Sequence, residues 1–273
     1  MIGVAAVACI VLVLAGQAVA VSRLHARAAR NRPAHARAGG AAGAGPDVPA
    51  DGGWLVNLLR RRRWLRRSLS FASVAVTLVA VGMIGYPFYT NLYADRVQSR
   101  LRNQFSSEQL RTDYETCRQV GVQNEACQIR DGDSLTRIQI PDIEVDVVVV
   151  EGTSASALRA GAGHYPSTPL PCETGNVAIA GHRTTYGRPF HDLDLLDPGD
   201  EIRLQIPIGE CTYRVVDVDA DGNGYSIVSP NDVGVIAGTN DNRLTLTTCH
   251  PKGSARQRLI VTAELVASPF VTA

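Results

Sequence analysis

The sequence predicts a mainly β domain, built as a sandwich or a barrel, behind two membrane-spanning helices. Two long uncharged apolar runs lie in the first 94 residues, and seven short strand-like runs, separated by Gly, Pro, Asp and Asn, follow residue 134. With 45% apolar residues in 273, the chain can bury one sizeable core. The composition therefore favours a membrane-tethered globular domain over a disordered chain.

The first apolar run, residues 1–22, contains no charged side chain and is long enough to cross a bilayer core of about 30 Å. A cleaved signal peptide is the alternative, but the run lacks the positive segment that precedes the apolar part of such peptides. The second run, 68–94, is flanked by aromatic side chains that favour the membrane interface, namely Trp64, Tyr86, Tyr89 and Tyr93. We therefore expect transmembrane helices at 1–22 and 68–94.

The segment between these runs, residues 23–67, holds eleven arginines against Asp47 and Asp51. It has too little apolar surface to offset the entropy of ordering, so we expect it to be disordered. A basic tract can bind nucleic acid, but between two membrane spans the positive-inside rule explains it more simply, and no nucleic-acid partner is expected. The loop is therefore expected in the cytoplasm. The domain after the second span is expected on the extracytoplasmic side, close to the membrane lipid.

A helical stalk is expected at 95–133, because Val97, Leu101 and Phe105 recur at a spacing of four residues. The β domain is expected at 134–273. Its strand-like runs are LTRIQI, IEVDVVVV, NVAIAG, EIRLQI, CTYRVVDV, LTLTTC and LIVTAEL. Short helices are expected near 154–160 and 189–195.

Cysteine usage points to one unusual thiol. Outside the cell, cysteines are usually oxidised in pairs, and the chain offers four for this purpose: Cys117, Cys127, Cys172 and Cys211. Of the three possible pairings, we favour Cys117 with Cys127 and Cys172 with Cys211. Cys9 lies inside the first apolar run, which leaves Cys249 at the end of the strand-like run RLTLTTC. Cys249 could simply be a small buried residue of the core. An unpaired thiol outside the cell instead favours a role as a nucleophile.

A nucleophilic thiol needs a base or a cation nearby, because a free thiol is mostly protonated at neutral pH. His250 is adjacent in sequence, yet successive residues of a strand point to opposite sides. His182 ends the run NVAIAGH, where a buried strand emerges into a loop, so it is the candidate partner; the alternative is a surface histidine. His191 is expected at the surface.

Acyl transfer also needs a fixed donor where the oxyanion develops. Arg256 and Arg258 lie two residues apart before the last strand, and a strand period of two would point both to one face. Two solvated edge arginines are the alternative. Arg258 is favoured, because it directly precedes the apolar run LIV, where paired backbone would hold its side chain in place.

These residues carry a family resemblance. TLTTC, ending at Cys249, resembles the TLxTC signature of sortases, the cysteine transpeptidases of Gram-positive cell surfaces. His182 in AGHR and Arg258 in RLIV follow the same order, and the resemblance covers residues 134–266. TTCHP and AGHRTTYGRPF are most similar to the class E branch.

The resemblance implies a closed eight-stranded β-barrel with short helices and no cofactor. It also implies that Cys249 attacks the Thr carbonyl of a C-terminal sorting motif, LAxTG or LPxTG, on a surface protein. Arg258 would stabilise the oxyanion and His182 would protonate the leaving Gly amine. An amino group of a peptidoglycan precursor would then accept the acyl group.

One further motif, DADGNG, begins like a calcium-binding EF-hand loop, with candidate ligands at Asp219, Asp221 and Asn223. Its twelfth position is Pro230, where a bidentate Glu is needed. A hairpin turn is therefore favoured, and calcium, which some sortases bind, remains the alternative.

Two other functions are compatible with this organisation. An L,D-transpeptidase is also extracytoplasmic, β-rich and dependent on His and Cys, but it would carry an SHGC-like motif where this chain has TTCHP. A membrane-tethered β-barrel binding module with an inactive site is the alternative outside the enzymes. Labelling of Cys249 by a thiol probe at neutral pH distinguishes the two, because a catalytic thiol reacts and a buried structural thiol does not.

Overall fold

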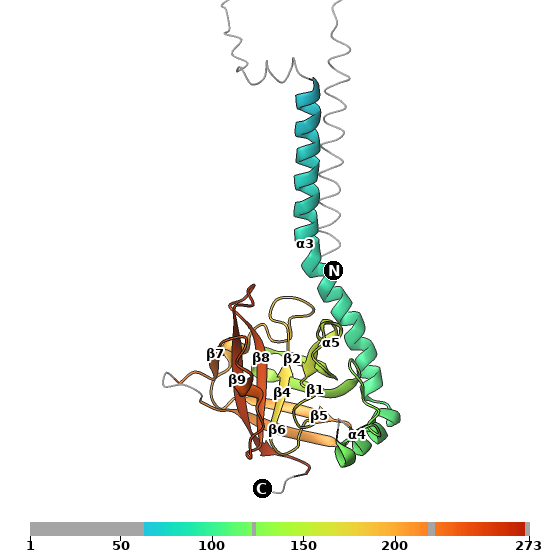
Figure 1. The fold of residues 1–273 in the computed structure, drawn as a ribbon, viewed down its shortest axis with the longest axis vertical. Helices are drawn as coiled ribbons and strands as arrows, with labels where there is room; N and C mark the ends of the chain where they lie inside the picture. Colours follow the sequence, from blue (N-terminus) through green and yellow to red (C-terminus); the bar gives the residue numbers. More distant parts are fainter. Residues whose placement is uncertain (1–62, 122–123, 218–221, 271–273) are drawn as a thin grey trace, which may run out of the picture. The chain divides into compact units, whose positions relative to one another are not determined.

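The computed structural model describes residues 63–121, 124–217 and 222–270 (Figure 1). The helices are α3 (Arg63–Phe105), α4 (Glu108–Val120), α5 (Ala155–Ala160) and the 3-10 turns η1 (Pro141–Ile143), η2 (Leu193–Leu195) and η3 (Val233–Ile236). The strands are β1 (Ser134–Ile140), β2 (Val145–Glu151), β3 (Ala162–His164), β4 (Asn176–Ala180), β5 (Glu201–Ile206), β6 (Gly209–Val215), β7 (Tyr225–Val228), β8 (Arg243–His250) and β9 (Gln257–Ala267). Contacts divide the chain into the units 1–82 and 83–273.

The strands form a closed ring, as expected for a barrel. Their order is β6-β5-β1-β2-β3-β4-β8-β9, and β9 pairs again with β6 to complete eight strands. The ninth strand, β7, pairs with β9 outside this ring. β9 is long enough to serve both: residues 258–261 pair with β7, and residues 263–267 pair with β6.

The strands β3 and β7 were not among the expected runs. They have three and four residues, which is too short for an alternating pattern to be visible in the sequence. β3 is nevertheless essential to the ring, because it pairs in parallel with β2 and antiparallel with β4. The expected short helices correspond to α5 and, at the second position, to the shorter η2.

The interior of the ring is apolar and fully covered. Side chains with no exposed surface include Leu135, Ile138, Ile179, Leu204 and Leu244, which come from the four strands β1, β4, β5 and β8. Inward positions alternate along β5, whose burial changes at every residue, as expected for a strand with one solvated face. Tyr114 of α4 is also buried, and its hydroxyl donates to the Pro171 carbonyl oxygen at 2.9 Å.

Helix α3 contains the second predicted membrane span. Residues Arg67–Phe105 are long and apolar enough to cross a membrane, and their most apolar stretch is not buried in protein. The C-terminal part of α3 carries the expected apolar stripe: Leu101 packs on Val148 and Val150, with Val97 and Phe105 beside it. The first predicted span and nearly all of the basic loop lie outside the described residues.

Two disulfides join Cys117 to Cys127 and Cys172 to Cys211, which confirms the favoured pairing. The first closes a loop at the end of α4. The second ties the segment before β4 to β6, on the far side of the ring in the strand order. All four cysteines are buried.

Replacing both cysteines of a bridge by alanine should destabilise the domain, and the two bridges should differ. Chain entropy predicts a loss of about 4 kcal/mol for the longer bridge and about 3 kcal/mol for the shorter one. The bridges span 39 and 10 residues, and similar burial of the cysteines makes the cavity terms comparable. Urea unfolding of the detergent-solubilised chain measures both, and an equal or larger loss for Cys117→Ala/Cys127→Ala would contradict this order.

Candidate active site

Strand β8 carries the unpaired thiol and is held on both sides by other strands. It runs parallel to β4, with Ala180 opposite Thr247, and antiparallel to β9, with Cys249 opposite Arg258. β4 ends at Ala180, and His182 follows two residues later, on the β4 side of β8. Cys249 thus lies on the strand between β4, which leads into His182, and β9, which carries Arg258.

The threonines of TLTTC fix this register. Thr245 donates from its hydroxyl to the Asn176 side chain of β4 at 2.7 Å, and Thr248 donates to the Gly181 carbonyl oxygen at 2.7 Å. The Gly181 N–H in turn donates to the Thr247 carbonyl oxygen at 3.0 Å. Threonine suits the strand through its branched Cβ, and its hydroxyl needs a partner when it is buried. Sliding β8 past β4 would break all of these hydrogen bonds.

His182 is half-buried at the start of the loop that follows β4. Its ring lies against Tyr186, with the ring centroids 5.3 Å apart. Burial disfavours the imidazolium and lowers the pKa of His182 below its usual 6.5. Gly181, just before it, has the Phe190 ring so close that a Cβ would come within 2.5 Å of it, so only glycine fits there.

Arg258 and Arg256 are not equivalent. Arg258 is paired in β9 opposite Cys249, and its Nη1 donates to the carbonyl oxygens of Ala255 and Gln257, each at 3.1 Å. The other guanidinium nitrogens make no hydrogen bond within the described residues. β9 begins at Gln257, so Arg256 lies in an exposed bend and the period-two argument for a shared face was wrong for it. Arg258 was favoured over Arg256 as the oxyanion donor because of its place in the strand, and only Arg258 is paired in β9.

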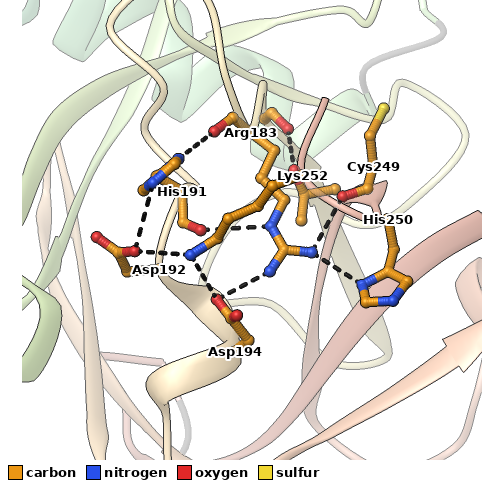
Figure 2. Close-up of polar contacts among 9 residues, drawn as sticks. Arg183, His191, Asp192, Asp194, Cys249, His250 and Lys252 are labelled. Carbon is orange, nitrogen blue, oxygen red and sulfur yellow. Dashed lines mark hydrogen bonds and ion pairs between the residues drawn. The ribbon is translucent and has the colours of Figure 1, made fainter. Parts of the chain in front are cut away.

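His250 is directed away from the thiol, as expected for the next residue of a strand. Figure 2 shows the Cys249 sulfur pointing away from the cluster that holds the His250 ring. The His250 Nδ1 accepts a hydrogen bond from Nη1 of Arg183 at 3.0 Å. His191, expected at the surface, is half-buried, and its Nδ1–H donates to the Arg183 carbonyl oxygen at 2.6 Å.

Arg183 is the site residue that sequence reasoning missed. Its side chain is buried, and its guanidinium joins three segments (Figure 2). Nε donates to the His191 carbonyl oxygen at 3.3 Å, Nη1 donates to the Cys249 carbonyl oxygen at 3.2 Å, and Nη2 pairs with Asp194 at 2.9 Å. The signal was present in the sequence as a charge three residues after the end of a buried strand. Arginine fits this place because its planar fork offers donors in several directions.

Asp194 and Lys252 extend the cluster to the β8–β9 turn. Lys252 pairs with Asp192 at 3.1 Å and with Asp194 at 3.4 Å. Burial alone would raise the pKa of Asp194, but a backbone hydrogen bond and the Arg183 charge outweigh it, and the pKa lies below its usual value. The Asp194 carboxylate is therefore ionised at neutral pH, and the cluster holds the backbone of Cys249 from the side opposite its thiol.

No metal centre is found in the part of the chain that the structure describes: there, no three His, Cys, Asp or Glu side chains gather where they could hold an ion. Asp219 and Asp221 of the calcium alternative lie outside the described residues.

Arg183→Met should lower the free energy of unfolding by about 3 to 5 kcal/mol, the cost of removing one partner from a buried ion pair. The matched control is Arg188→Met, because Arg188 is exposed in the same loop and should lose less than about 0.5 kcal/mol. Urea unfolding of the full chain compares them. Equal losses in the two variants would show that the buried guanidinium does not hold this region together.

The known proteins to which this chain is similar include sortases. The sortase domain family matches residues 138–266. Sortase D of Bacillus subtilis is 35% identical over 128 residues, which cover 45% of this chain and 60% of the relative. Sortase SrtE1 of Streptomyces coelicolor is 29% identical over 150 residues, or 50% of this chain and 41% of the relative. The chain thus spans less than two thirds of either relative.

A solved structure agrees. The Clostridium perfringens Sortase D5 transpeptidase superposes with a TM-score of 0.50 at 26% identity, covering 63% of this chain and 99% of that one. The Clostridium protein and the Bacillus relative are both named as D-type sortases. The expected resemblance to class E is represented by SrtE1. The matched region includes His182, Cys249 and Arg258, and residues 138–266 of this chain are a sortase domain.

Proposed function

We propose that the chain is a membrane-anchored cysteine transpeptidase. It cleaves a C-terminal LAxTG- or LPxTG-like sorting motif between Thr and Gly, and joins the Thr carboxyl to an amino group of a cell-wall precursor. The observation that supports this proposal is the strand register: Cys249 of β8 lies opposite Arg258 of β9, and His182 follows β4, the strand that pairs with β8 on its other side. The substrates are surface proteins bearing the sorting motif and a peptidoglycan precursor.

Each residue has one role in the proposed reaction. The Cys249 thiolate attacks the Thr carbonyl carbon, and the charge that develops on the carbonyl oxygen is stabilised by Arg258. The C–N bond then breaks as His182 gives a proton to the leaving Gly amine, which leaves a thioester on Cys249. The acceptor amine attacks that thioester and loses a proton to His182, the C–S bond breaks, and the Cys249 thiolate is released.

The proposed location is the outer face of the cell membrane. Both disulfides belong to the β domain and to the helix before it, and such bridges persist in oxidising compartments. α3 is a candidate membrane span, and the arginines that precede it favour a cytoplasmic N-terminal side. An enzyme held in this way meets membrane-bound substrates at the same surface.

Peptide cleavage tests the function directly. The full chain in detergent, incubated with LAxTG and LPxTG peptides and a primary amine, should yield the Thr–amine adduct by mass spectrometry. Cys249→Ala should yield none, because no thioester can form. A chain that cleaves neither peptide, and whose Cys249 resists a thiol probe at neutral pH, would instead be a binding module.

The arginine series tests the site. Arg258→Ala should lower kcat/KM for peptide cleavage about a hundred- to a thousandfold, the usual cost of losing an oxyanion donor. Arg258→Lys should recover little, because an ammonium lacks the planar fork. Arg256→Ala should change kcat/KM by less than about tenfold, since an exposed charge outside the strand only steers the substrate.

Circular dichroism of each arginine variant controls for folding. If Arg256→Ala is inactive and Arg258→Ala retains activity, the oxyanion donor has been assigned to the wrong arginine.

A further inference from the structure

The loop from His182 to Phe190 has an unusual backbone. It is closed by the Phe190 N–H, which donates to the His182 carbonyl oxygen at 3.2 Å. Within it, Tyr186, Gly187 and Arg188 all have positive φ, at 51°, 74° and 41°. Side-chain-bearing residues in this region cost of order 1 to 3 kcal/mol each and persist only where surrounding contacts hold them. The loop therefore needs support from outside itself.

That support comes from α3, whose residues from Met83 onward belong to the same unit as the barrel. The Gly187 N–H donates to Oδ1 of Asn91 at 3.2 Å. The Tyr86 and Tyr186 hydroxyls meet at 3.5 Å, and the Tyr93 ring lies edge-on to the Tyr186 ring with centroids 6.3 Å apart.

The approach of loop and helix is close. A Cβ placed on Gly187 would lie 3.3 Å from the Cβ of Ala94, a tighter contact than side chains usually make. Ala94 is 3% exposed, and Thr90, one turn earlier, is fully buried. This face of α3 is thus part of the packed domain, unlike Tyr89 of the same helix, which is 66% exposed.

Tyr186 contacts the helix and the site at once. Its ring lies against the His182 ring at 5.3 Å between centroids, with 35° between the planes. Among the described residues, Tyr186 is the aromatic side chain whose ring contacts the His182 ring. One aromatic ring therefore links α3 to the histidine that gives and takes the proton.

We propose that α3 is part of the catalytic apparatus: Tyr86, Asn91 and Tyr93 hold Tyr186 against His182, and Tyr186 is a positioning residue for that imidazole. This inference rests on the proposed function of His182. In this proposal α3 does more than anchor the chain. The residues of α3 that face the loop determine where the His182 imidazole lies relative to the Cys249 thiol. Asn91 contributes without touching His182, since it fixes the backbone of the residue after Tyr186.

The test uses the full chain in detergent with 13C-labelled histidine, the His182 signal being assigned by its loss in His182→Gln. Tyr186→Ala should move the pKa of His182 up towards 6.5, because removing the ring admits water to a group whose pKa burial lowers. It should also lower kcat for peptide cleavage about ten- to a hundredfold, with KM nearly unchanged, as expected for a misplaced acid.

Three further variants make the result specific. Asn91→Ala should shift the pKa of His182 in the same direction by a smaller amount. Tyr186→Phe keeps the ring contact and should leave both the pKa and kcat close to the wild-type values. Tyr89→Ala, the matched control on the exposed face of α3, should change neither quantity.

An unchanged His182 pKa and kcat in folded Tyr186→Ala would overturn the proposal, as would an equal response in Tyr89→Ala. If the wild-type chain cleaves neither peptide, the proposed function fails. The titration of His182 in Asn91→Ala still decides whether α3 controls the imidazole, because that readout needs no substrate.

Discussion

The pairing of β8 with a parallel strand on one side and an antiparallel strand on the other is the constraint on which the site depends. A strand paired on both edges cannot slide or twist independently, so its last residues keep a fixed height relative to both neighbours. Side-chain hydrogen bonds from Thr245 and Thr248 further fix the position of β8 relative to β4 and the residue after it. The thiol of Cys249 therefore depends on backbone pairing for its position, while the residues beside it come from segments some 67 positions earlier and 9 positions later.

A second layer of interactions acts on the backbone behind the thiol. Arg183 bonds the Cys249 carbonyl oxygen, the His250 ring and Asp194, and Lys252 connects the same carboxylate to the β8–β9 turn. A buried guanidinium is costly to desolvate, and only a full set of partners offsets that cost. The His182 loop has a different support, the tyrosine and asparagine side chains of α3. The proposed nucleophile and the proposed acid are thus held by separate sets of contacts.

Much of this could be predicted from the sequence, because the relevant signals are local. Alternating runs predicted seven strands, and the count of extracytoplasmic cysteines led to the favoured pairing that both bridges confirm. TLTTC with AGHR and RLIV indicated the three proposed site residues. The short strands β3 and β7 could not be found, since three or four residues give no period. Arg183 and Tyr186 were missed because their partners are distant in sequence. Arg256 was misjudged because the start of β9 is set by pairing with β8, which sequence period alone does not reveal.

The double role of β9 also bears on how the domain folds. β9 supplies Arg258 and, through its far end, joins β6 to close the ring, so one late segment completes both the barrel and the site. Strands that pair across long sequence distances form slowly, because the loop entropy must be lost before their contacts form. The short β8–β9 hairpin brings Arg258 opposite Cys249 without a long loop, whereas the ring stays open until the far end of β9 pairs with β6, so the candidate site gains its closed barrel last.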